Sequence, residues 1–346
     1  MNMNSQNIIT IAIDCMGGDF GTSMTIPAAI NFLQNSQHQN VNLLLIGQEN
    51  VINESLQKFC DKNILQKFLD ENLIKIIHAE QVVAMDDSPT LCIRNKKNSS
   101  MRIAINAVKD KIANACVSAG NTGALMATSH FVLKMLPNIE RPAICGAIPT
   151  TVPDKCSFML DLGANVDCNE HHLYQFAKMG TAWARAVGQI ENPKAALLNI
   201  GSEEIKGNNV VKNAAKLLKD DPNFIGNIEG DAIYHGEIDV IVCDGFVGNV
   251  ALKTSEGLVQ TLAAALKQEY KRTLISKFGA ALSLPALKRF KNRFDHRRYN
   301  GAILLGLQGI SIKSHGSADV VAFEHAIEHA YIAAKNDILQ KIQNLI

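Results

Sequence analysis

The sequence predicts an α/β protein with a mostly parallel sheet. Short apolar runs that indicate buried strands alternate with longer segments of helical periodicity along most of the 346 residues. Five of the strands are followed directly by polar loops that contain glycine, and these loops begin at Asp14, Ser118, Asp161, Gly201 and Asp244. Such an alternating order is typical of parallel strands joined by crossover helices.

In the first part of the chain, strands are expected at 8–13, 41–46, 73–78 and 115–117, where branched and aliphatic residues form short runs. Helices with an apolar face are expected to follow them, through Ile26, Ile30 and Leu33, then at 51–60, 101–111 and from residue 124. Residues 86–90 are expected to be a turn-rich stretch, because Asp, Ser and Pro gather there.

The second part of the chain continues the alternation. Strands are expected at 157–160, 195–200 and 238–243, with a short strand at 223–226 and a strand or extended crossover at 141–148. Residues 302–305 and 310–312 are short apolar runs. Helices are expected at 171–187, 210–218, 250–271 and 318–340. Because no repeat and no low-complexity linker divides the chain, we expect a single large domain over residues 1–346.

The loop Ser118-Ala119-Gly120-Asn121-Thr122-Gly123-Ala124 joins a predicted strand to a predicted helix. Asn121 or Thr122 can cap that helix, because a short polar side chain accepts hydrogen bonds from first-turn N–H groups. Gly120 and Gly123 let the backbone approach a ligand closely. The positive end of the helix dipole makes such a corner an anion site, although the same residues also suit an ordinary capped helix.

In an open parallel sheet, ligands bind beyond the carboxyl ends of the strands. We therefore expect the five glycine-bearing loops to meet at one edge of the sheet. The polar residues that would gather there are Asp14, Asp19, Asn121, Thr122, Asp161, Asn165, Lys206, Asn208, Asp244, Asn249, Lys253, Lys313 and His315. Amides, hydroxyls, glycine N–H groups and lysines suit a small oxyanion such as phosphate.

Several familiar chemistries are disfavoured because their motifs are absent from the sequence. There is no G-x-x-x-x-G-K-[ST] loop for ATP and no G-x-G-x-x-G after the first strand for a dinucleotide. The zinc motif H-E-x-x-H and the serine-hydrolase motif G-x-S-x-G are also absent. The eight cysteines include no C-x-x-C pair, and most lie in apolar runs that indicate buried reduced thiols. Carboxylates at strand ends could hold Mg²⁺ but commonly brace loops, so we expect neither a metal nor a cofactor.

The overall charge and hydrophobicity indicate where the protein acts. The net charge of +1 gives no reason to expect a nucleic-acid partner. No apolar run reaches the roughly 18 residues that a membrane-spanning helix needs. We therefore expect a cytoplasmic protein, for which contact with a membrane surface stays open.

Six motifs resemble one family in matching order. They are D-C-M-G-G-D from Asp14, S-A-G-N-T-G-A-L from Ser118, D-L-G-A-N from Asp161, K-G-N from Lys206, C-D-G-F-V-G-N from Cys243 and K-S-H-G-S from Lys313. Together they span most of the chain and resemble the PlsX family of phosphate acyltransferases. The resemblance implies a homodimer with a three-layer α/β/α fold, similar to the isocitrate and isopropylmalate dehydrogenases and the phosphotransacetylases.

The reaction that this resemblance implies transfers a fatty acyl group from acyl-[acyl carrier protein] to inorganic phosphate. The acyl phosphate then feeds phosphatidic acid and phospholipid synthesis, which implies a downstream glycerol-phosphate acyltransferase as a partner. On the matching motifs, the expected catalytic residues are Lys206, Asn121 and Asp244. The residues expected to bind phosphate or substrate are Asp14, Gly17, Gly18, Gly120, Thr122, Gly123, Asp161, Asn165, Asn208, Gly245, Asn249, Lys253, Lys313 and His315.

The residue types suit that chemistry. A thiol with a pKa of about 8.5 leaves as a thiolate with little acid assistance, and phosphate is already an anion. Positioning and oxyanion donors can then replace a nucleophile–base triad. Lys206 could neutralise the phosphate or attack the thioester itself as an amine. The alternatives are a CoA-dependent phosphotransacetylase or a dehydrogenase on the same fold, or an inactive scaffold that binds a carrier protein or a membrane.

Residues 267–298 are expected to form an inserted basic amphipathic helical hairpin. The segment has ten Lys or Arg and two Asp or Glu, a surplus of +8. Its apolar stripe is expected to break at Ser283-Leu284-Pro285, where Pro285 would open a second helix. A membrane or the acidic carrier protein is expected to contact Leu274, Phe278, Leu282, Lys288, Arg289, Lys291 and Arg293. A dimer interface is the alternative that the same pattern allows.

Overall fold

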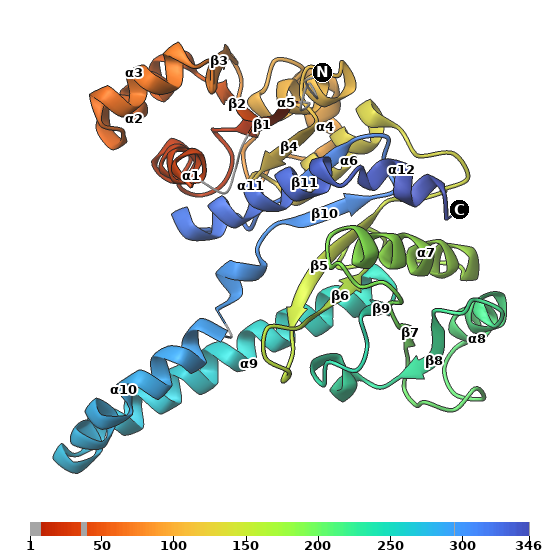
Figure 1. Cartoon of the computed structure of the whole chain (residues 1–346). Coiled ribbons are helices and arrows are strands. Elements are labelled where there is room, and N and C mark those ends of the chain that lie inside the picture. The colour runs from red at the N-terminus through yellow and green to blue at the C-terminus, as the bar shows by residue number, and fades with distance from the viewer. Residues whose placement is uncertain (1–7, 36–39, 294, 346) are drawn as a thin grey trace, which may run out of the picture.

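The strands of the computed structural model, which describes residues 8–35, 40–293 and 295–345, join into one eleven-stranded sheet (Figure 1). Across the sheet they are β3 (Ile74–His78), β2 (Val41–Gly47), β1 (Ile9–Asp14), β4 (Ala115–Ser118), β11 (Ile310–Lys313), β10 (Ala302–Leu305), β5 (Ala143–Pro149), β6 (Cys156–Leu160), β9 (Val240–Val242), β7 (Ala195–Leu198) and β8 (Phe224–Ile228). Most pairings are parallel, so the predicted fold class is confirmed.

Two strands in the middle of the sheet reverse its direction. β10 is antiparallel to both β11 and β5, and β5 is antiparallel to β6. Across these three pairings, β6, β9 and β7 run opposite to β1, β4 and β11. The carboxyl ends of the two sets of strands therefore face opposite edges of the sheet.

Helices cover both faces of the first half of the sheet. α1 (Thr22–Gln34) and α11 (Val320–Lys335) pack against each other and lie on one face, and α5 (Ser100–Lys109) and α6 (Thr122–Leu133) lie on the other. Alternate residues of β1 point to opposite faces: Ile11 and Ile13 join the core with Phe323 of α11, whereas Ala12 joins the core with Ile105 of α5. This alternation produces the three layers.

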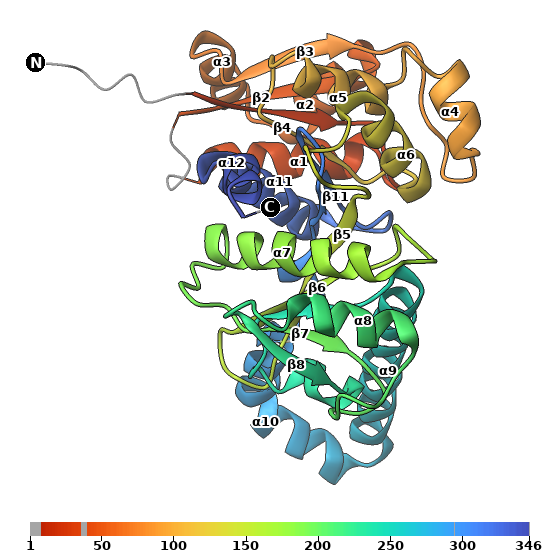
Figure 2. The same ribbon diagram turned by 90° about the vertical axis from the view of Figure 1, so that its right-hand side faces the viewer.

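Helices α7 (Glu170–Ala186) and α8 (Asn209–Leu218) cover one face of the second half of the sheet (Figure 2). α7 packs on β6, β9 and β7, and α8 packs against α7. The remaining helices are α2 (Glu49–Phe59), α3 (Lys62–Asp70), α4 (Pro89–Asn95), α9 (Gly245–Arg272), α10 (Leu274–Arg293) and α12 (Ile338–Gln343), with short 3₁₀ turns η1 (Gly230–Tyr234) and η2 (His296–Tyr299).

Three helical segments differ from the prediction. α3 was not predicted; it is capped by Asp61, and Phe68 is its one buried residue. α4 forms within the expected turn-rich stretch, because Pro89 also suits the first turn of a helix. The helix predicted at 318–340 is divided into α11 and α12 by Asp337, whose φ of 49° is left-handed.

α9 and α10 pack together as a hairpin that projects from the body of the molecule (Figure 1). The predicted break at 283–285 is wrong: the chain turns at Thr273, and Pro285 lies inside α10. Thr273 suits the turn because its hydroxyl accepts a hydrogen bond from the N–H of Ser276 at 3.0 Å. Among the helices that the structure describes, none has both the length and the hydrophobicity needed to cross a membrane.

Candidate functional site

Three polar loops meet at the carboxyl ends of β1, β4 and β11. The N–H of Asp19 donates to the carbonyl of Gly316 at 2.9 Å, which joins the first loop to the third. The N–H of Ser314 donates to the carbonyl of Ser118 at 2.9 Å. The hydroxyl of Ser118 donates to Oδ2 of Asp14 at 2.6 Å. The three loops therefore form one connected cluster, which we call the Lys313 cluster after its buried cation.

Glycines allow these loops to touch through their backbones. A Cβ at Gly17 would stand 2.7 Å from the N of Gly120, closer than real Cβ atoms come to backbone. A Cβ at Gly18, whose φ is +84°, would stand 2.9 Å from the carbonyl oxygen of Gly316. The predicted glycines thus bring the loops together, and a side chain at either position would separate them.

Lys313 lies at the centre of this cluster with 9% of its surface exposed. Its Nζ donates to the carbonyl of Ala119 at 3.3 Å and to that of Ser314. Burial lowers the pKa of Lys313 to about 8; the carboxylates of Asp14 and Asp19 oppose this shift, and the cation of Lys253 adds to it. Lys253 belongs to α9, so this helix brings a second positive charge near the cluster.

Asp14 is the buried acidic partner in the cluster. Burial raises the pKa of its carboxyl, and hydrogen bonds from the Ser118 hydroxyl and the Met16 N–H oppose that shift. A buried carboxyl and a buried amine therefore lie within electrostatic range of each other, at the edge where the sheet topology favours a ligand site.

Asn121 caps α6, as the sequence allows: its Oδ1 accepts from the N–H of Ala124 at 2.9 Å. Its Nδ2 donates to the carbonyls of Met85 at 2.7 Å and Asp87 at 3.0 Å. The side-chain amide thus holds the 85–87 segment against α6. The first-turn N–H groups and the exposed hydroxyl of Thr122 are the donors that this helix start offers to an anion.

His315 completes the third loop of the cluster. Its backbone N–H donates to Oδ1 of Asn300 at 2.9 Å, and its ring Nδ1 lies 2.9 Å from the hydroxyl of Ser317. The imidazole is thereby held within its own loop, two residues from Lys313.

A second group of predicted residues lies after β6 and β9. Asp161 is fully buried, and its carboxylate accepts from four backbone N–H groups at 2.7–3.2 Å and from Nδ2 of Asn165 at 2.8 Å. Burial raises the pKa of Asp161, and these hydrogen bonds oppose the shift. Nδ2 of Asn165 also donates to the carbonyl of Pro142 at 2.7 Å. Both side chains brace the 161–165 loop.

The amino end of α9 is packed against this brace. The N–H of Gly245 donates to the carbonyl of Asn165 at 2.7 Å, and a Cβ at Gly248 would stand 1.9 Å from the carbonyl oxygen of Asp161. Asp244 caps the helix by accepting from the N–H of Val247 at 2.8 Å. Asn249 is exposed one turn further on, beside Gly163.

Lys206 and Asn208 lie on the loop that follows β7. Asn208 caps α8 through the N–H of Val211 at 2.9 Å, and the side chain of Lys206 is exposed. We find no contact between this loop and the Lys313 cluster among the described residues. The same loop carries Ile200 and Ile205, both almost fully exposed. The sequence analysis did not predict that these two isoleucines would be exposed, although their position beside a polar turn was visible in the sequence.

The prediction that all five loops share one edge of the sheet is wrong. The loops after Asp14 and Ser118 lie at one edge with the Lys313 loop, and those after Asp161, Gly201 and Asp244 lie at the other. β10 and β5 reverse the strand direction between the two sets. α9 connects the sets, because it begins at the second edge and carries Lys253 to the Lys313 cluster.

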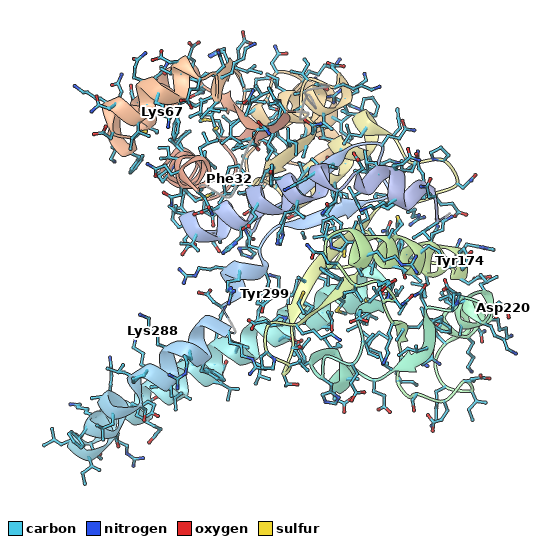
Figure 3. All side chains as sticks on the ribbon, in the orientation of Figure 1. Phe32, Lys67, Tyr174, Asp220, Lys288 and Tyr299 are labelled. Atoms are coloured by element: carbon cyan, nitrogen blue, oxygen red, sulfur yellow. The ribbon has the colours of Figure 1, made fainter. Side chains whose placement is uncertain are left out.

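The hairpin residues are placed mostly as predicted. Leu274, Phe278 and Leu282 are 68–82% exposed, and the exposed Lys288 lies on the projecting α10 next to Arg289 (Figure 3). Arg293 instead donates to the carbonyl of Thr151 and joins the hairpin to the body. The side chain of Lys291 lies outside the described residues.

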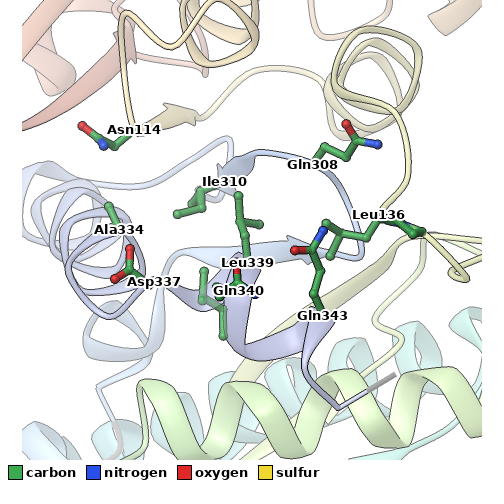
Figure 4. A pocket seen from close by; sticks show the side chains of 11 residues that line it. Asn114, Leu136, Gln308, Ile310, Ala334, Asp337, Leu339, Gln340 and Gln343 are labelled. Atoms are coloured by element: carbon green, nitrogen blue, oxygen red, sulfur yellow. The ribbon is translucent and has the colours of Figure 1, made fainter.

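A cavity of about 490 Å³ lies elsewhere (Figure 4). Its lining includes Asn114, Gln308, Ile310, Leu339 and Gln343. Asn114 and Ile310 stand at the amino ends of β4 and β11, so this cavity opens at the edge opposite the Lys313 cluster. None of the residues that line it was predicted to belong to the site.

Comparisons with known proteins bear on what the cluster does. The model of a family described as "Fatty acid synthesis protein" matches residues 9–341. A protein of Paraburkholderia phymatum named "Phosphate acyltransferase" is 54% identical over 335 residues, which cover 96% of this chain and 86% of that protein.

Solved structures with a similar fold are phosphotransacetylases. One from Streptococcus pyogenes has a TM-score of 0.60 at 16% identity and covers 98% of this chain and 95% of its own. EutD phosphotransacetylase from Staphylococcus aureus has a TM-score of 0.58 at 15% identity, with coverages of 97% and 94%. At these identities the likeness concerns the fold alone.

Proposed function

The chain belongs to the PlsX family of phosphate acyltransferases, and on this premise we propose that it joins inorganic phosphate to the acyl group of an acyl-[acyl carrier protein]. Transfer of an acyl group to phosphate, in the service of phospholipid synthesis, follows from the family. The thioester donor is our proposal. The carrier protein is the acidic partner, and free phosphate is the acceptor.

The reaction can be written with its atoms balanced. A phosphate oxygen attacks the carbonyl carbon of the thioester, a C–O bond forms, and the C–S bond breaks. The thiolate of the carrier leaves and takes a proton from water, because its conjugate thiol has a pKa of about 8.5. The protein therefore has two tasks: to hold an anion against the carbonyl and to stabilise the oxyanion that develops there.

We assign the phosphate to the Lys313 cluster. The observation that carries this assignment is the buried amine of Lys313, held among three glycine loops with a second cation, Lys253, nearby. The start of α6 adds first-turn N–H groups and the Thr122 hydroxyl. Asp14, Gly17, Gly18, Gly120, Gly123 and His315 shape this side of the site.

The second group of residues is proposed to act on the donor. Lys206 is the exposed cation of the 201–208 loop, and in our proposal it either neutralises a substrate anion or attacks the thioester as an amine. Asp161, Asn165, Asn208, Asp244 and Gly245 set the shape of the loops around it. Asn249 is exposed and stays a candidate for direct contact.

The deciding assay mixes the purified protein with hexadecanoyl-[acyl carrier protein] and phosphate and measures free thiol. Phosphate-dependent release of thiol is the expected result. Equal rates with hexadecanoyl-CoA would favour a CoA-dependent enzyme. Tight binding of the carrier without turnover would favour a scaffold.

We also propose a homodimer that lies at the cytoplasmic surface of a membrane. Apolar side chains along α9 and α10 are exposed in the single chain, including Leu262 and Leu266 as well as Leu274, Phe278 and Leu282. Such a surface on a projecting basic hairpin suits either a second copy or anionic lipid. A position at the membrane would also bring the acyl phosphate to a downstream glycerol-phosphate acyltransferase.

A further inference from the structure

Two large apolar side chains stand exposed beside the Lys313 cluster. Phe20 is 54% exposed and Met85 is 45% exposed. Neither belongs to the buried core of the described residues, yet each sits on a segment that is hydrogen-bonded to the loops of the cluster. Exposed apolar groups that are fixed in place at a polar site call for an explanation by ligand binding.

Met85 is held on two sides. Its carbonyl accepts from Nδ2 of Asn121 at 2.7 Å, so its backbone is fixed to the start of α6. Its terminal methyl lies 2.9 Å from the point where a Cβ on Gly316 would stand. The thioether of Met85 therefore lies against the loop that follows Lys313.

Phe20 lies on a segment whose backbone is hydrogen-bonded on both sides of it. The N–H of the preceding residue, Asp19, donates to the carbonyl of Gly316 at 2.9 Å. The carbonyl of Phe20 accepts from the hydroxyl of Ser23 at 2.6 Å. The side chain of Met85 thus lies against Gly316, three residues from Lys313, and Phe20 directly follows the residue whose N–H is bonded to the same glycine.

We propose that Phe20 and Met85 form the first part of the subsite for the alkyl chain of the acyl substrate. This inference rests on the proposed function, because the chain begins at the carbonyl that phosphate attacks. The carbonyl carbon and the phosphate oxygen must approach to about 3–3.5 Å, so the first methylenes have to leave the Lys313 cluster over the nearest apolar surface. Methionine suits chains of different length because its side chain is flexible and polarizable.

The test compares chain lengths. Hexadecanoyl- and acetyl-[acyl carrier protein] are given to the wild type, to Phe20→Gln/Met85→Gln and to Leu69→Gln. Leu69 lies on α3 with the same exposed fraction as Met85, 45%, and serves as the matched control. We expect the double variant to lose about tenfold in kcat/KM for hexadecanoyl substrate, the effect of removing contact with about two methylenes. Acetyl turnover should change by less than about twofold, because an acetyl group has no methylene to contact these side chains.

A binding measurement separates this inference from the proposed reaction. The affinity of each variant for the two acyl carriers, measured without phosphate, should show the same loss of preference for the long chain. Equal losses for both chain lengths, or a change in oligomeric state, would overturn the subsite while leaving the reaction intact. A wild type that neither binds nor uses either acyl carrier would overturn both.

Discussion

Lys313 and Asp14 are the buried ionisable residues at the centre of the Lys313 cluster. Burial lowers the pKa of Lys313 and raises the pKa of Asp14, so it favours the neutral form of each side chain. The protonated amine of Lys313 therefore exists at neutral pH in a place that disfavours it. A bound dianion would relieve that cost and stabilise the charged amine. At the residue scale, the cluster is arranged to gain more from binding phosphate than an exposed lysine would.

The first prediction concerns the charge of Lys313. Lys313→Met should lower kcat/KM for phosphate by about 100-fold or more, since it removes one preorganised cation. In the wild type, kcat/KM for phosphate should fall as pH rises through about 8, because Lys313 loses its proton there. Steady-state kinetics between pH 6 and 9 measure this. A profile that stays level across pH 8 would contradict the role of the amine.

The second prediction concerns a glycine. Gly248→Ala should destabilise the fold by about 1–3 kcal/mol, because the new Cβ would stand 1.9 Å from the carbonyl oxygen of Asp161. Gly257→Ala on the same helix meets nothing within 4 Å and should stabilise the fold by about 0.5–1 kcal/mol. Urea unfolding of both variants tests the contrast, and similar free energies of unfolding would contradict it.

At the residue scale, several side chains that the sequence assigned to the site make local hydrogen bonds in the structure. Asn121, Asp161, Asp244 and Asn208 were expected to face substrate. In the structure their side chains accept hydrogen bonds from nearby N–H groups and cap helices or brace loops. Short polar side chains suit both roles, binding a ligand and accepting hydrogen bonds from nearby backbone N–H groups. The sequence alone does not show which of the two roles such a residue has.

At the scale of elements, α9 and α10 carry many of the exposed large apolar side chains of the described residues. Helices that lie in a core bury one face, whereas these two leave large side chains in solvent along the whole hairpin. The sequence indicated the hairpin through its charge and its apolar spacing. The turn was predicted at Pro285 rather than at Thr273, because proline is common in the first turn of a helix. In the structure Pro285 lies inside α10 instead.

The third prediction tests this surface. The triple variant Leu274→Gln/Phe278→Gln/Leu282→Gln should no longer sediment with vesicles of anionic phospholipid, since it removes the apolar residues at the far end of the hairpin. Circular dichroism should report unchanged helix content. Undiminished sedimentation would argue against the membrane role, and a loss of dimer by ultracentrifugation would assign the surface to a second copy.

At the scale of the whole molecule, α9 joins the two halves of the sheet. It begins beside the Asp161 brace at one edge and carries Lys253 toward Lys313 at the other. Lys253 also pairs with Glu256 at 2.8 Å, which holds the cation on the exposed side of the helix. A movement of α9 would therefore change the electrostatic field at the Lys313 cluster.

The fourth prediction follows from this connection. Lys253→Met removes a nearby positive charge, so the pKa of Lys313 should rise. The fall of kcat/KM for phosphate should then shift from about pH 8 to a higher pH. Lys267→Met, further along the same helix, serves as the control and should leave the profile in place. An unshifted profile in Lys253→Met would show that α9 does not act on the cluster.

Local patterns of residues were enough to predict the alternation of strands and helices, most of their bounds, the glycine loops and the family. These follow from local properties: apolar periodicity, turn residues and motifs that need no knowledge of distant partners. The 302–313 segment illustrates the limit. Its two short apolar runs were visible in the sequence, but the strands β10 and β11 that they form and the neighbours of those strands were not predicted.

No local pattern revealed that β10 and β5 reverse the sheet and send the carboxyl ends of β6, β7 and β9 to the other edge. A strand pairs through backbone hydrogen bonds that are the same for every residue, so its partner and direction depend on the packing of the entire chain. For that reason the loops of Asp14 and Lys313 became neighbours, and those of Asp161 and Lys206 did not join them.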